Sequence, residues 1–263
     1  MRSKLSILLL LLLHASSIHL CVSLASRQDL KKQKPLRQRK DTLSVERHLQ
    51  HIRGYRYVIG SDDSGRGCIA GPVVTASCCI VGDLQDENAV IIPEVDDSKL
   101  LSRESRNRIY ETILSRPKSF VWAVASRSNQ DIDATSMDQA TQECFQETIE
   151  SVINQLQELD GKNMPPLEDD NIMRFYSIID GHKSPKISIS SRPWKGGDEM
   201  VYSVALASIL ARVTHEYIME NTSIPLYGFE DNHGYPTRSH IQALHQHGPS
   251  AIHRKSCKPV QGR

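Results

Sequence analysis

The sequence lacks the cysteine pattern that would identify a zinc-binding or disulfide-rich protein. Its 263 residues include six cysteines, and no group of them has the spacing of a zinc site. Cys78 and Cys79 are adjacent in an apolar stretch, so on a strand their side chains point to opposite faces. The sequence also has no internal repeat. We therefore expect free thiols, several of them buried, in a reducing compartment.

The sequence also lacks a large excess of charge of either sign. It has 32 Lys and Arg against 31 Asp and Glu, a formal net charge of +1. Residues 1–40 hold nine of the basic and one of the acidic residues, so the body keeps 32 − 9 = 23 basic and 31 − 1 = 30 acidic residues, a net charge near −7. A nucleic-acid-binding protein with an acidic body must use a local basic patch.

No hydrophobic run is long enough to cross a membrane comfortably, because the leucine-rich stretch covers only residues 5–13. A basic start and small residues around Ala25 predict a signal-like segment over 1–25, followed by a basic transit-like or disordered linker over 26–50. We expect import into a plastid through the secretory route. A mitochondrial presequence is the first alternative and secretion the second. We expect no stable membrane association after processing.

The remaining residues, 51–263, predict one catalytic domain of mixed α/β class. Alternating and β-branched stretches predict strands over 55–61, 71–81, 119–126, 174–180 and 186–190. The glycine-rich segment 64–71 should join the first two strands as a hairpin. Capping residues and apolar periodicity predict helices over 102–115, 136–159, 198–221 and 237–248. A capping box is expected at Ser136.

Four aspartates stand where such elements end or begin. Asp62 and Asp63 end the first strand, Asp180 ends an apolar strand, and Asp198 opens a long apolar helix. Carboxylates at such positions can meet at one edge of a sheet, where they repel one another unless a cation is present. Oxygen ligands favour Mg²⁺ or Mn²⁺ over zinc. The pattern therefore predicts a metal-dependent phosphodiesterase.

The tripeptide Gly65-Arg66-Gly67 follows the first two aspartates directly. Its glycines let backbone N–H groups approach a phosphate or a sugar hydroxyl closely, and its arginine adds a fork of donors. The tripeptide alone would also suit a tight hairpin turn. Its specificity comes from its place between the aspartates and Gly71-Pro72-Val73-Val74.

Together these motifs resemble the ribonuclease HII family, the type 2 ribonucleases H, in their bacterial form. The resemblance covers about 57–260 in seven ordered blocks, which lie at 60–74, 97–106, 133–141, 179–181, 197–211, 227–237 and 248–260. It implies a ribonuclease H-like mixed β-sheet flanked by helices, with a C-terminal helical extension. It also implies a monomer and two-metal-ion cleavage on the 5′ side of ribonucleotides in RNA–DNA hybrids or duplex DNA, leaving 3′-hydroxyl and 5′-phosphate ends.

By the same resemblance, the metal-site acids are Asp62, Asp63, Asp180 and Asp198. The turn that reads the substrate backbone is Gly65, Arg66 and Gly67, and Tyr235 is the side chain that stacks on the sugar. Lys99 is a candidate phosphate contact, whereas Asp97 should only fix its own loop. His182, beside Asp180, is expected to be a surface residue and not a general acid.

Asp63 departs from the family pattern, which has glutamate at this position. Its side chain is one methylene shorter, and Mg²⁺ requires near-ideal octahedral geometry, so the change could slow the enzyme or favour Mn²⁺. A catalytically weakened nucleic-acid-binding homologue is therefore the alternative function. A type 1 ribonuclease H or a resolvase-like relative is disfavoured, because those proteins lack the Gly-Arg-Gly turn.

Overall fold

The computed structural model describes residues 42–86, 89–161 and 174–261. The signal-like segment predicted over 1–25 and most of the linker predicted over 26–50 therefore lie outside the described residues. Within these ranges, no helix is both long enough and apolar enough to cross a membrane. Of the six cysteines, the five described ones are free thiols, and four of them are buried.

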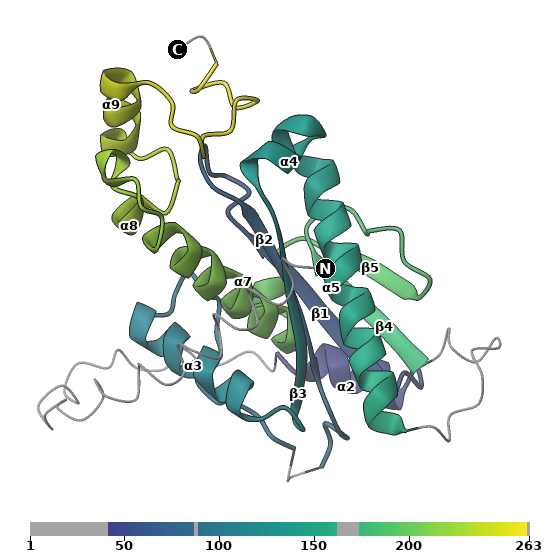
Figure 1. Ribbon diagram of the computed structural model, residues 1–263. Coiled ribbons are helices and arrows are strands. Elements are labelled where there is room, and N and C mark those ends of the chain that lie inside the picture. The colour runs from purple at the N-terminus through teal and green to yellow at the C-terminus, as the bar shows by residue number, and fades with distance from the viewer. Residues whose placement is uncertain (1–41, 87–88, 162–173, 262–263) are drawn as a thin grey trace, which may run out of the picture. The chain divides into compact units, whose positions relative to one another are not determined.

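A five-stranded mixed sheet forms the centre of the domain (Figure 1), in the order β3-β2-β1-β4-β5. The strands are β1 (Tyr57–Ser64), β2 (Val73–Ile80), β3 (Phe120–Arg127), β4 (Phe175–Asp180) and β5 (Ser190–Trp194). The first three strands pair antiparallel, whereas β4 runs parallel to both β1 and β5. This sheet confirms the predicted fold class and the predicted hairpin of β1 and β2.

Helices cover both faces of the sheet (Figure 1). They are α2 (Ser44–His51), α3 (Arg103–Ser115), α4 (Asn129–Ala134), α5 (Met137–Asp160), α7 (Tyr202–Glu220), α8 (Phe229–Asn232) and α9 (Arg238–His247). Two short 3-10 turns, η3 (Gly197–Glu199) and η4 (Pro225–Tyr227), lie on either side of α7 along the chain. The N-caps predicted for α3, α5 and α9 are confirmed, because Ser102, Ser136 and Thr237 each accept a backbone N–H of the first turn.

The alternation of side chains along β1 explains this layered packing. Tyr57 and Ile59 join an apolar cluster with α5, whereas Val58 packs against the start of α7 on the other face. Gly60 allows the closest approach, because a Cβ atom there would lie 2.2 Å from the backbone carbon of Ser203 in α7. Helix α7 therefore rests directly on the backbone of β1.

Three local predictions differ from the structure. The last strand covers 190–194 and not 186–190. Helix α4 was not predicted, and the complete capping box lies at its start, between Ser128 and Asp131. At the predicted box, Ser136 caps α5, but the side chain of Gln139 bonds Glu143 and does not return to Ser136. Helix α2 covers Ser44–His51 and so lies almost wholly within the segment predicted as a linker.

Helix α2 is held to α7 by a buried acid. Glu46 is fully buried, and its Oε1 accepts hydrogen bonds from the backbone N–H of Ser203 at 2.7 Å and from its hydroxyl at 2.9 Å. These bonds join α2 to the start of α7. The polar, basic composition of the linker sequence concealed this anchored helix.

The C-terminal extension is a small helical unit built on the loop that follows β1. Tyr227 and Phe229 stack with ring centroids 5.4 Å apart, and His240 and His253 pack around them. Ala70 pairs with His253 as an isolated β-bridge. The extension therefore fixes the segment that carries the Gly65-Arg66-Gly67 turn.

Candidate active site

Three of the four predicted acids lie on the face of the sheet covered by α7. Ser61 of β1 pairs with Ile179 of β4 in parallel register. The next residue on each strand is an aspartate, so Asp62 and Asp180 lie side by side. Asp62 is two residues beyond Gly60 and so faces α7. Asp198 lies in η3, just before α7 begins, and is 3% exposed. Asp63 points toward the opposite face, as strand alternation requires.

The position of Asp198 corrects one prediction. The chain forms a 3-10 turn at 197–199, and α7 begins only at Tyr202. Val201 has an extended backbone, with φ −127° and ψ 119°, and this separates the two helical segments. Asp198 therefore does not occupy the first turn of the long helix, and the dipole of α7 is not the reason for its placement.

The carboxylates influence one another electrostatically. Burial raises the pKa of Asp62 well above its usual value, and the charges of Asp63, Asp180 and Asp198 raise it further. Burial also raises the pKa of Asp63 to about 6, an effect that Arg66 opposes and Asp180 reinforces. The pKa of Asp180 is raised by burial and by Asp198, against the effect of the Gly197 N–H. The four acids are therefore close enough to destabilise one another's charges.

Local donors engage the oxygens of three of the four acids. Asp62 Oδ1 accepts the N–H of Asp63 at 2.7 Å, and Asp180 Oδ1 accepts the N–H of Gly197 at 2.7 Å. Asp198 Oδ2 accepts from Lys99 Nζ at 2.9 Å, and this bond raises the pKa of the Lys99 ammonium. Lys99 thus supplies one positive charge to a site that has four negative ones.

The donor set suits a hard divalent cation. It consists of carboxylate oxygens, whose pKa values are raised first by burial and then by one another's charges. Within the ranges that the structure describes, however, no three His, Cys, Asp or Glu side chains are already arranged to hold a metal ion. Asp62, Asp180 and Asp198 are instead each bonded to a donor of the protein.

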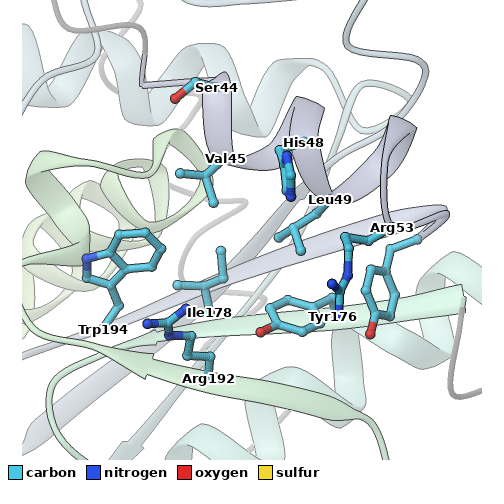
Figure 2. A pocket seen from close by; sticks show the side chains of 10 residues that line it. Ser44, Val45, His48, Leu49, Arg53, Tyr176, Ile178, Arg192 and Trp194 are labelled. Atoms are coloured by element: carbon cyan, nitrogen blue, oxygen red, sulfur yellow. The ribbon is translucent and has the colours of Figure 1, made fainter.

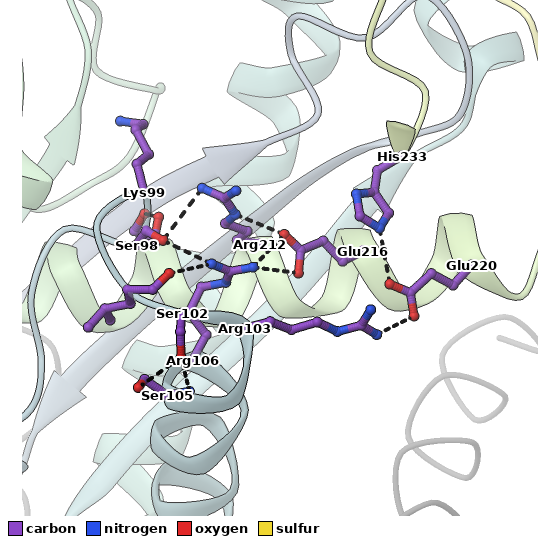
Figure 3. Close-up of polar contacts among 12 residues, drawn as sticks. Ser98, Lys99, Ser102, Arg103, Ser105, Arg106, Arg212, Glu216, Glu220 and His233 are labelled. Carbon is purple, nitrogen blue, oxygen red and sulfur yellow. Dashed lines mark hydrogen bonds and ion pairs between the residues drawn. The ribbon is translucent and has the colours of Figure 1, made fainter. Parts of the chain in front are cut away.

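The loop that carries Lys99 is fixed from below by α3 and α7 (Figure 3). Arg106 bonds both oxygens of Glu216 at 3.0 Å and also donates to the carbonyl oxygen of Ser98 at 3.3 Å. Ser98 and Ser208 of α7 share a hydrogen bond between their hydroxyls at 2.9 Å. As predicted, Asp97 fixes its own loop, because its Oδ1 accepts the backbone N–H of Lys99 at 2.8 Å.

The turn at Gly65-Arg66-Gly67 lies beside the acids. Gly65 has φ +84°, and a Cβ atom there would lie 2.6 Å from the ring of His215 in α7, so a side chain is excluded on both counts. Arg66 is paired with Asp138 at the start of α5, and one of its nitrogens lies 3.9 Å from Asp63 Oδ1. Its guanidinium is therefore already near the candidate site.

Arg254 holds this turn from behind, a role for which no sequence pattern is specific. It is fully buried and donates to the carbonyl oxygens of Cys68 at 2.6 Å, Pro72 at 2.7 Å and Gly71 at 2.9 Å. One guanidinium thereby satisfies three backbone acceptors of the segment that follows the turn. The only available hint was its place in the His253-Arg254-Lys255-Ser256 block.

Tyr235 lies at the edge of the site with 41% of its surface exposed. Its ring stands 3.6 Å from where a Cβ atom of Gly67 would be. Behind it, His240 Nδ1 donates to the carbonyl oxygen of Tyr235 at 2.8 Å, and His240 Nε2 then accepts from His253 Nε2 at 3.1 Å. His253 Nδ1 accepts from the Ser250 hydroxyl at 2.8 Å. The two imidazoles are thus both neutral and support the backbone of Tyr235.

The structure therefore brings together the four predicted acids, Lys99 and the Gly-Arg-Gly turn, with Tyr235 at its rim. His182 is exposed, as expected. The residues that sequence reasoning missed act behind the site: His215, which packs on Gly65, Asp138, which holds Arg66, and Arg254.

Comparisons with known proteins agree with this arrangement. The family model described as Ribonuclease HII matches residues 59–260. A ribonuclease HII from Carboxydothermus hydrogenoformans is 37% identical over 83% of this chain and 84% of its own length. A ribonuclease HII from Desulfitobacterium hafniense is 31% identical over 85% of this chain and 77% of its own length.

Solved structures show the same fold at lower identity. Ribonuclease HII in its complex with PCNA from Archaeoglobus fulgidus superposes with a TM-score of 0.55 at 23% identity, covering 79% of this chain and 98% of that one. Bst-RNase HIII in complex with Mn²⁺ gives a TM-score of 0.52 at 17% identity, covering 81% of this chain and 70% of that one.

Proposed function

The chain belongs to the ribonuclease HII family, and from this premise we propose that it hydrolyses the phosphodiester on the 5′ side of ribonucleotides in RNA–DNA hybrids or embedded in duplex DNA. The products would carry 3′-hydroxyl and 5′-phosphate ends. The observation that supports this most strongly is the convergence of Asp62, Asp180 and Asp198 on one face of the sheet, where their charges raise the pKa of Asp62.

The four acids, with Asp62 at their centre, would hold the divalent ions, Mg²⁺ or Mn²⁺. When bound, such ions activate water and stabilise the leaving oxygen. Bst-RNase HIII, which shares the fold, has been solved with Mn²⁺. Lys99 would exchange Asp198 for a substrate phosphate, because its side chain is 69% exposed and its ammonium already stands at the site.

Recognition of the ribonucleotide would come from the turn at 65–67. The 2′-hydroxyl distinguishes RNA from DNA at a single nucleotide, and backbone groups beside two glycines can approach it closely. Arg66 would exchange Asp138 for a phosphate, because both partners of this pair are about half exposed. Tyr235 would stack on the neighbouring sugar, a contact that is worth about 1–3 kcal/mol when the partner is a base.

The cellular role would be removal of ribonucleotides or primers from organelle DNA during replication and repair. The leucine-rich start and the basic segment that follows favour a plastid, with a mitochondrion as the alternative. We also propose that the chain acts as a monomer. Fluorescence microscopy of the full chain fused to a C-terminal reporter tests the location, and sedimentation equilibrium tests the oligomeric state.

A cleavage assay tests the proposed activity. The substrate is a DNA duplex with one ribonucleotide, and the products are mapped at nucleotide resolution with Mg²⁺, with Mn²⁺ and with EDTA. We expect a single cut 5′ of the ribonucleotide, dependent on the metal. The Asp63→Glu variant, assayed in parallel, shows whether the shorter acid limits the rate or shifts the choice of metal.

The assay also separates the alternative function. Binding of the duplex without any cutting in either metal would identify a nucleic-acid-binding homologue, and recovery of cutting in Asp63→Glu would assign the loss to that residue. An all-DNA duplex is the control, and it should remain intact.

A further inference from the structure

A second concave site lies between α2 and the strands β4 and β5 (Figure 2). Its volume is about 400 Å³, and ten residues line it. Ile178 of β4 is buried against the apolar residues of α2 and α7 at its floor. Asp180 follows Ile178 by two residues on the same face, a step of about 6.6 Å along a strand. The cavity therefore begins directly behind the candidate acids.

The rim of this cavity is basic, although the body of the chain is acidic. Arg53, Arg192 and His48 line it and are exposed, and the lining residues within the described part of the chain include no Asp or Glu. Neither guanidinium forms an ion pair with a carboxylate of the described residues. The Arg192 guanidinium instead lies 5.2 Å from the centre of the Trp194 ring. This rim is the local basic patch that a nucleic-acid-binding protein with an acidic body requires.

Aromatic rings form the walls. Trp194 lies at one end of the cavity, and Tyr176 and Arg53 lie at the other (Figure 2). The rings of Tyr176 and Tyr55 are 4.8 Å apart and tilted by 53°. Trp194 pairs with Asp180 in the sheet, so one wall of the cavity adjoins the candidate acids. Rings with cationic side chains at their border are the arrangement that proteins use for single-stranded nucleic acid, where bases stack and phosphates meet arginines.

The charge and place of the cavity indicate its occupant. The basic segment of residues 1–40, with nine Lys and Arg against one acidic residue, would be repelled by the rim. A double helix keeps its bases stacked inside and cannot offer a ring to the cavity without unpairing. A strand that is already unpaired offers both bases and phosphates at no such cost.

We propose that this cavity binds a single-stranded extension of the nucleic acid whose duplex part occupies the neighbouring acids. The inference rests on the proposed function for its duplex partner, and it adds a substrate preference. A duplex with an unpaired overhang that reaches the cavity should bind better than the same duplex with blunt ends. Only one of the two overhang directions should have this effect, because the cavity lies on one side of the acids.

Fluorescence of Trp194 tests binding without requiring cleavage. The full chain carries two tryptophans, and a Trp122→Phe variant, checked by circular dichroism, leaves Trp194 as the only reporter. The probe is a ten-nucleotide single-stranded DNA without secondary structure. We expect saturable quenching. The slope of the logarithm of the binding constant against the logarithm of salt concentration should be smaller in magnitude by about 1.4 in the Arg53→Gln/Arg192→Gln double variant, because two phosphate contacts are lost. No quenching, or quenching equally strong with a single mononucleotide, would overturn the proposal.

Cleavage kinetics of the otherwise unaltered chain test the preference. Blunt duplexes with one ribonucleotide are compared with duplexes that carry a ten-nucleotide overhang on either side of it. We expect one overhang to lower KM about tenfold, as one stacked base would. In the double variant the ratio of the two KM values should approach one. Arg108→Gln changes an exposed arginine of α3 whose side chain, in the described structure, bonds only Ser105, and this matched control should keep the full ratio.

The outcomes distinguish the two proposals. If no duplex is cut, the proposed activity fails, and the fluorescence titration still decides whether the cavity binds single strands. If the blunt duplex is cut and neither overhang changes KM, the activity stands and the cavity proposal is overturned.

Discussion

The Lys99 ammonium lies 2.9 Å from Asp198 Oδ2 and is the nearest positive charge bonded to the acid cluster. It lowers the pKa of both Asp63 and Asp180 while it remains there. Lys99 thus partly replaces a divalent ion in the metal-free protein. Substrate and metal would together release it from Asp198.

Replacement of Lys99 by Gln should therefore have two effects. KM for the duplex should rise by up to about fivefold, because an exposed ionic contact contributes about 1 kcal/mol or less. The rise in Tm on adding Mn²⁺ should be larger than in the unaltered chain, because more negative charge is left unbalanced before metal binds. Steady-state kinetics and thermal unfolding measure these effects. Lys118→Gln, an exposed lysine before β3, is the control and should change neither.

Replacement of Asp62 by Asn should separate activity from stability. Burial and, after it, the charges of the neighbouring acids raise the pKa of this carboxyl well above its usual value, so its loss should raise the Tm of the metal-free protein. Cleavage should fall by at least about 10²–10³-fold, as when other charge-stabilising groups of active sites are removed. A variant that is destabilised and still active would contradict this interpretation. Glu111→Gln, on the exposed side of α3, should leave both quantities unchanged.

Metal affinity should depend on pH through Asp63. Its pKa in the metal-free protein is raised to about 6, so below pH 6 a proton must leave before the carboxylate can bind an ion. The apparent Kd for Mn²⁺ should therefore rise by up to about tenfold for each pH unit below 6. Calorimetric titrations between pH 5 and 7 measure this slope. In Asp63→Asn the contribution of this group should be absent, and an identical slope in that variant would exclude Asp63 as a ligand.

Acid should weaken the C-terminal unit through His253. Burial and the neighbouring His240 lower the pKa of His253 from 6.5 to about 4. The unfolded chain then binds more protons than the folded one between pH 6.5 and pH 4. The free energy of unfolding should therefore fall as pH drops through this window, by about 1.4 kcal/mol per unit at its middle.

Urea unfolding at several pH values, with Mg²⁺ absent, measures this dependence. His253→Gln should show a shallower pH dependence than the unaltered chain, whereas His182→Gln, in an exposed loop, should show the same one. Equal slopes in all three proteins would remove His253 from the explanation.

Local patterns in the sequence predicted much of the fold. The β-branched and apolar runs of β1 and β2, and the caps at Ser102, Ser136 and Thr237, are properties of short segments, and the structure confirms these strands and caps. Helix α2 was missed because its stability depends on Glu46 reaching Ser203, a contact between residues far apart in the chain. The break before α7 was missed because apolar periodicity continues through Val201.

The site was predictable to the same degree. The family motifs predicted the acids and the glycine turn, because these residue types occur together in short segments with characteristic spacing. Arg254 and Asp138 act through the carbonyls and the guanidinium that they bond, and no spacing along the chain records such partners. The cavity beside β5 was likewise not predicted, because its aromatic rings and arginines come from three separate segments of the chain, at 53–55, 176 and 192–194.

The bare backbone of Gly60 determines how this enzyme can respond to its substrate. Because no side chain separates β1 from α7 at this residue, the strand and the helix cannot slide past one another. Asp62 on β1 and Asp198 before α7 therefore behave as parts of one rigid body. Adjustment on substrate binding must then come from the side chains that leave one partner for another, above all Lys99 and Arg66. Catalytic alignment is thereby decided during folding, before any nucleic acid arrives.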